Sequence, residues 1–157
     1  MALPILNDTP QYTMTIPSSG KEVKFRPYLI KEEKVLLIAA ESQDMGQAIS
    51  AIQDTIEACT HGVLDPTKLA TFDLEYAYLK IRSKSVGERV ELTLDCAACD
   101  KRVPFMFDME EVKIDIPEMK WNVQITDTIS VDLQWPRYAD IDLNDDASDV
   151  GFEMVEA

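Results

Sequence analysis

The residues best suited to chemistry are two cysteines three positions apart, in the run Cys96-Ala-Ala-Cys99. Two thiolates across a tight hairpin turn supply half of a tetrahedral zinc site. The other half would have to come from Cys59 and His61, which lie on a different element, or from a partner chain. The spacing predicts one of three states: a zinc knuckle with Cys96 and Cys99 as ligands, two unbonded thiols at a hairpin tip, or a redox disulfide.

Catalytic chemistry has little support in the sequence. A dyad of Cys59 and His61 would need an orienting acid and an oxyanion hole, which adjacent positions do not supply. The run Asp140-Ile-Asp-Leu-Asn-Asp145 begins like a calcium loop, but Asp145 stands where that loop needs glycine, and Gly151 where it needs glutamate. No nucleophile, base and stabiliser can be assembled. We therefore expect no enzyme activity and, apart from zinc, no cofactor.

The hydrophobic pattern predicts an α+β fold. Its expected parts are an N-terminal β-hairpin, a central helical cluster, a second β-hairpin with short antiparallel strands, and an acidic C-terminal segment. Strands are predicted at 12–16, 22–25, 90–95, 102–107, 112–116, 121–125 and 129–135. Helices are predicted at 31–42, from the cap Asp44 to 59, and at 72–85.

The passage from 72 to 94 gives the sharpest local predictions. Phe72, Tyr76 and Leu79 form one helical stripe, so Tyr76 and Leu79 are expected to face the core. Lys80 and Lys84 are then expected to point outward. Residues 90, 92 and 94 are apolar and alternate with polar ones, which predicts a half-buried strand.

Length and charge limit the classes of function. A chain of 157 residues can bury one core, and we expect residues 1–137 to form a single α+β domain. The net charge of -14 argues against a phosphate-binding surface, so no nucleic-acid partner is expected, and it favours a basic protein partner. No run approaches the roughly 18 to 20 apolar residues of a membrane span, so no membrane segment is expected.

The segment 138–157 holds seven acidic residues and no lysine or arginine. It is predicted to be a solvated tail or an arm that lies on a basic partner. The residues from 145 onward also look like the start of a helix, with acids first and then Val150, Met154 and Val155 at helical spacing.

Three runs carry a family resemblance: Gly20-Lys-Glu-Val-Lys-Phe-Arg-Pro27, Lys31-Glu-Glu-Lys-Val-Leu-Leu37 and Arg82-Ser-Lys-Ser-Val-Gly-Glu88. In order and spacing the chain resembles the T4-type bacteriophage baseplate (hub) protein family. The resemblance implies a structural or assembly protein of the contractile-tail baseplate hub, assembled in the host cytoplasm and located in the virion. Its partners would be other baseplate and tail hub proteins of a multi-protein assembly. The resemblance also suggests that Arg82 ties the hairpin at Glu88 or Glu91.

A different class of function stays open at this point. Cys96 and Cys99 would also suit a small zinc-ribbon-like adaptor. The acidic tail would suit an inhibitor that mimics nucleic acid. Binding to tail proteins, rather than to host proteins, is the observation that separates the baseplate hypothesis from these two.

Overall fold

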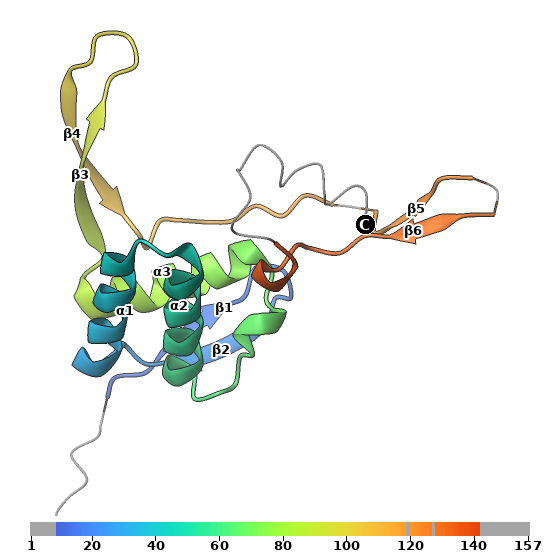
Figure 1. The fold of residues 1–157 in the computed structure, drawn as a ribbon, viewed down its shortest axis with the longest axis horizontal. Helices are drawn as coiled ribbons and strands as arrows, with labels where there is room; N and C mark the ends of the chain where they lie inside the picture. The colour runs from blue at the N-terminus through green and yellow to red at the C-terminus, as the bar shows by residue number, and fades with distance from the viewer. Residues whose placement is uncertain (1–8, 119, 127, 142–157) are drawn as a thin grey trace, which may run out of the picture.

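The computed structural model describes residues 9–118, 120–126 and 128–141 (Figure 1). The chain forms an α+β fold, as the sequence predicts. Its elements, in order, are β1 (Tyr12–Thr15), β2 (Glu22–Phe25), α1 (Ile30–Ser42), α2 (Met45–Cys59), the 3-10 helix η1 (Pro66–Lys68), α3 (Thr71–Val86), β3 (Arg89–Asp95), β4 (Arg102–Asp108), β5 (Asn122–Gln124), β6 (Ser130–Asp132) and the 3-10 helix η2 (Tyr138–Asp140). The strands pair as three separate antiparallel hairpins, β1–β2, β3–β4 and β5–β6.

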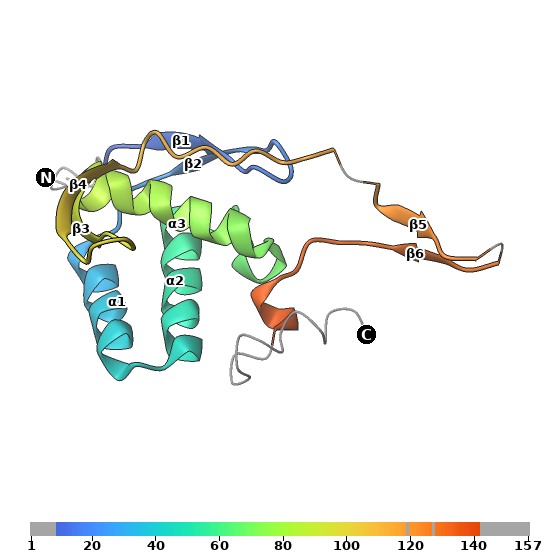
Figure 2. The same cartoon turned by 90° about the horizontal axis from the view of Figure 1, so that it is seen from above.

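The three helices and the first hairpin make up the body of the molecule. Helix α3 lies between the β1–β2 hairpin and the pair α1 and α2 (Figure 2). Apolar side chains from the first hairpin, α2, α3 and the loop between these helices form the core, and their burial is the main force that holds the body together. Its buried members are Met14, Ile16, Val23, Phe25, Ile56, Cys59, Leu64, Leu74, Ala77 and Ile81.

Buried polar contacts fix the elements of the body relative to one another. Asp73, near the start of α3, accepts hydrogen bonds from the backbone N–H of Ser18, at 3.0 Å, and from the Ser18 hydroxyl. Arg26, at the end of β2, pairs with Glu32 of α1 at 2.9 Å, and both side chains are buried. A buried charge needs such a partner, so each contact specifies one arrangement of the hairpin and the helices.

Local signals in the sequence account for the ends of the elements. The side chain of Asp44 accepts a hydrogen bond from the N–H of Gln47 and caps α2, as predicted. Gly87 follows α3 with a φ of 135°, a conformation open to glycine, and lets the chain turn into β3.

The face that α3 presents to the core differs from the predicted one. Leu74, Ala77 and Ile81 are buried, whereas Tyr76 and Leu79, which are expected from the sequence to face the core, are only half-buried. The prediction that Lys80 and Lys84 point outward is wrong, since their side chains are 12% and 22% exposed. The chain that leaves β4 returns across this side of α3, and it supplies oxygens that the two ammonium groups can reach.

The hairpins β3–β4 and β5–β6 project from the body in different directions (Figure 1). Leu92 and Leu94 of β3 are 40% and 52% exposed, so the prediction of a half-buried strand is wrong. The alternation is real, but none of the described elements covers the apolar side. Residues 112–116 form no strand, and β5 and β6 are shorter than predicted. The predicted helix start from 145 onward lies outside the described residues.

Candidate functional site

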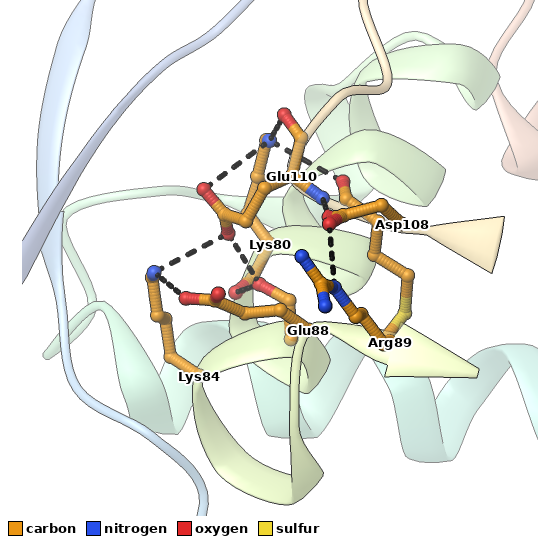
Figure 3. Close-up of polar contacts among 8 residues, drawn as sticks. Lys80, Lys84, Glu88, Arg89, Asp108 and Glu110 are labelled. Atoms are coloured by element: carbon orange, nitrogen blue, oxygen red, sulfur yellow. Dashed lines mark hydrogen bonds and ion pairs between the residues drawn. The ribbon is translucent and has the colours of Figure 1, made fainter. Parts of the chain in front are cut away.

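The β3–β4 hairpin, which we call the long arm (residues 89–108), is rooted on the side of α3. The ammonium group of Lys80 donates to the backbone oxygen of Glu110 at 3.0 Å (Figure 3). The hydroxyl of Ser83 donates to Oε1 of Glu110 at 2.8 Å. Met109, between this carboxylate and β4, is buried, and its N–H donates to the oxygen of Glu88 at 2.8 Å. The arm is therefore held where it leaves the body.

Ion pairs complete the root of the long arm. Nζ of Lys84 lies 2.6 Å from Oε1 of Glu88 and 3.5 Å from Oε1 of Glu110, and Nε of Arg89 lies 3.3 Å from Oδ2 of Asp108 (Figure 3). Burial by itself would raise the pKa of Glu110. The Ser83 hydroxyl and the lysine ammonium groups outweigh burial and hold this pKa below its ordinary value. Glu110 thus stays charged and joins α3 to the arm.

Arg82 has a different partner from the one that the resemblance suggests. Its Nη1 lies 3.5 Å from the sulfur of Met109. Glu88 instead pairs with Lys84, one helical turn back along the chain. The role of Glu110 could not be predicted from the sequence, because it depends on where the chain passes after β4, and no local pattern encodes that path.

The long arm has one apolar face. Val90 lies opposite Phe107, Leu92 opposite Phe105, and Leu94 opposite Val103. Residues directly opposite each other in a ladder share a face, so these six form a continuous surface, which we call the apolar arm face. The other face carries polar residues, including Thr93 and the Asp95–Arg102 ion pair at 3.5 Å. The arm therefore presents an uncovered apolar surface of the kind that binds another protein.

The predicted cysteine turn forms the tip of the long arm. The N–H of Cys96 donates to the oxygen of Lys101 at 3.0 Å, and the N–H of Asp100 donates back to the oxygen of Cys96 at 2.9 Å. Hydrogen bonds from the N–H of Ala98, and then from the thiol and N–H of Cys99, lower the pKa of the Cys96 thiol. Donors that stabilise a thiolate favour metal binding, because the thiolate is the form that binds metal. The tip thus brings the two thiols within hydrogen-bonding reach of each other, and metal binding by them stays a prediction.

Cys59 and His61 do not join this pair. Cys59 is fully buried in the core of the body, 3.8 Å from Nη1 of Arg26, and burial raises the pKa of its thiol to about 11. His61 is exposed on the turn after α2. Among the described residues, no three histidine, cysteine or acidic side chains gather into a group that could hold a metal ion.

The β5–β6 hairpin, which we call the tryptophan arm (residues 121–135), is anchored by aromatic contacts. The rings of Trp121 and Trp135 pack edge to face with centroids 5.0 Å apart, and Trp135 packs in the same way on Phe72 of α3, also at 5.0 Å. Beyond this anchor, Val123, Ile125 and other apolar residues of the arm are exposed. The tryptophans thus attach the arm to the body, and the arm itself exposes a second apolar surface.

A third exposed surface lies on the helices. An open groove of about 530 Å³ runs between α1 and α2, with Val35 and Ile38 on one side and Asp44 and Asp54 on the other. Ile38 is 67% exposed, although it lies in the middle of its helix. The groove combines apolar and acidic side chains and suits an apolar surface that carries a basic residue. None of the described helices is long and apolar enough to cross a bilayer.

Among the described residues, the small body and its two projecting hairpins leave three apolar surfaces exposed. Comparison with models of protein families gave a match over residues 9–157 to the family described as T4 bacteriophage base plate protein. The chain belongs to this family, and it is a structural component of a phage baseplate, part of a multi-protein assembly in the virion tail. Searches of curated proteins and of solved structures gave no match.

Proposed function

We propose that the chain is a structural or assembly protein of the baseplate hub of a contractile-tailed phage, and that it acts by protein–protein binding without enzymatic turnover. Its partners are then other hub proteins, and its assembly takes place in the host cytoplasm. Membership of the base plate family supports the baseplate location. The apolar side chains of the two arms and of α1, left exposed in the isolated chain, support the binding mode.

The proposal rests on exposed apolar side chains that do not belong to the core of the body. Ile38 on α1, Leu94 on the long arm and Ile125 on the tryptophan arm contribute to separate surfaces, and all are more than half exposed. Exposing so many large apolar side chains favours association in water. Surfaces that point in different directions allow one small chain to contact several neighbours at once.

The hub role is tested by recovering the tagged chain from infected cells and identifying the bound proteins. Tail or baseplate proteins of the same phage are expected. Ile38→Gln should reduce their recovery, since it removes an apolar contact but changes folding stability by less than about 0.5 kcal/mol. Glu41→Gln, on the same helix, is the matched control and should leave recovery unchanged. Recovery of only host proteins would contradict the proposal and favour the nucleic-acid mimic.

A permanent hub component and an assembly factor that leaves are separated by mass spectrometry. A permanent component is present both in purified virions and in the lysate of infected cells. An assembly factor is found in the lysate and is absent from virions. Either result fits a role at the baseplate hub, and the comparison decides which of the two roles the chain has.

A further inference from the structure

The tip of the long arm supplies half of a metal site. Cys96 and Cys99 provide two sulfur ligands, whereas structural zinc is held by four. Asp95, the nearest carboxylate on β3, already pairs with Arg102. Within the parts of the chain that the structure describes, no third ligand joins the two thiols. The tip lies far from the body, so it is open to ligands from a second molecule (Figure 1).

The apolar arm face lies on the same hairpin as the two thiols, and none of the described residues covers it. The hydrogen bond from the Cys96 N–H to Lys101 continues the ladder beyond Leu94 and Val103. Side chains in a strand alternate between the two faces, so residues 90, 92, 94 and 96 fall on one face. The apolar arm face therefore runs up to the first thiol, and one partner could cover both features.

The outer edge of β4 favours a partner that packs on the face rather than one that adds a strand. Pro104 lies opposite Thr93 within an unbroken ladder. Proline has no N–H, so at this position the outer edge lacks a donor for a further strand. Two sheets that pack face to face avoid this deficit, because they interact through side chains alone.

Charge favours a second copy of this chain at the arm. The whole chain carries -14, but residues 89–108 hold three basic and four acidic residues, a net charge of -1. Two copies can therefore approach arm to arm with little electrostatic repulsion, whereas contact through their other surfaces would bring more negative charge together. Lys101 and Arg102 follow the second cysteine directly, and they offset the negative charge that four thiolates around one Zn²⁺ would carry.

We propose that two copies of the chain pack their long arms face to face and share one Zn²⁺, held by Cys96 and Cys99 of each copy. A twofold axis along the arms brings tip to tip and apolar arm face to apolar arm face, because each copy presents the same surface. The four thiols release their protons to solvent, and the thiolates bind the ion at about 2.3 Å. Ala97 and Ala98, the small residues of the turn, let the tips come this close. The proposal does not depend on the baseplate role.

The test uses the full chain, reduced and free of metal, with Zn²⁺ as the probe. Sedimentation with and without Zn²⁺ measures the oligomeric state, and elemental analysis measures bound metal. The expected result is a dimer that contains about one zinc per two chains and returns to monomer with a chelator. Co²⁺ in place of Zn²⁺ should give the absorption bands of a tetrahedral site with four thiolates.

Variants separate the two parts of the proposal. Cys96→Ser with Cys99→Ser should abolish metal binding and the dimer, whereas Thr93→Ser, on the polar face of the arm, should leave both intact. Leu94→Asp keeps the thiols and should weaken the dimer at least about tenfold, since it places a charge in the apolar contact.

Four results would overturn the shared site. They are a monomer that binds one zinc per chain, a dimer that forms equally well without metal, a disulfide-linked dimer, and no zinc bound by the isolated chain. The Co²⁺ spectrum of the unaltered chain decides the ligand set even if a variant fails to fold. A spectrum with fewer than four sulfur ligands also rejects the proposal.

Discussion

The Ser83 hydroxyl on α3 donates a hydrogen bond of 2.8 Å to the Glu110 carboxylate, which lies just after β4 at the root of the long arm. This contact joins residues 27 positions apart and fixes where the arm leaves the body. Because its acceptor is ionised and only part-buried, its strength depends on pH and can be measured.

Acid should loosen the root of the long arm. The pKa of Glu110 is lowered from its ordinary value of 4.5, so this carboxylate stabilises the folded state above that pH and loses its contribution as the pH falls through the lowered value. The protection of the Met109 amide from hydrogen exchange should therefore drop in acid. Glu110→Gln should flatten this pH dependence, leaving the part due to Asp108, whose pKa is also lowered.

Glu111→Gln is the matched control for Glu110→Gln. Glu111 is the exposed neighbour of Glu110, so its substitution should leave the pH dependence unchanged. Equal pH profiles for the unaltered chain and Glu110→Gln would show that the carboxylate does not hold the arm.

The two leucines of α3 should differ in what they contribute to stability. Leu74 is buried in the core, so Leu74→Ala should lower the free energy of unfolding by about 2–5 kcal/mol. Leu79→Ala should cost about half of that or less, because Leu79 is only half-buried. Urea denaturation of the two variants measures both. A larger loss of unfolding free energy for Leu79→Ala than for Leu74→Ala would contradict this and support the core face predicted from the sequence.

The contact between Asp73 and Ser18 should hold the first hairpin to α3. Asp73→Ala leaves the N–H and hydroxyl of Ser18 without their acceptor, and it should cost about 1–3 kcal/mol of folding stability. Asp54→Ala, at an exposed position of α2, is the control and should change stability by less than about 0.5 kcal/mol. Coinciding denaturation curves for Asp73→Ala and Asp54→Ala would rule out a structural role for the Asp73 contact.

The acidic tail should act through charge if it binds a basic partner. Tyr138 packs against the core, and its hydroxyl donates to Glu75 at 2.6 Å, so the tail is best removed after Ile141. This truncation deletes six of the seven acidic residues of 138–157. It should weaken binding to a basic baseplate partner and flatten the salt dependence of binding, because exposed charges are screened beyond about 8 Å at physiological ionic strength. Unchanged affinity and salt dependence would mean that the tail is only a solvated end.

The sequence by itself determined most of the elements and several of their ends, although residues 112–116 form no strand. The alternation of 90, 92 and 94 marked a strand, Asp44 marked the cap of α2, and Cys96 with Cys99 marked a hairpin tip. These features depend on backbone geometry and on contacts within a few residues, so the chain encodes them locally.

Only the tertiary structure decided which faces are covered. Leu92 and Leu94 have the pattern of a half-buried strand, yet no element of the body packs on them. Lys80 looks like a surface residue, yet the segment after β4 passes over it and brings Glu110 within reach. Burial depends on the path of distant parts of the chain, and a periodic pattern marks an apolar face without saying what covers it. For the arms of this protein, none of the described residues of the body supplies that covering surface.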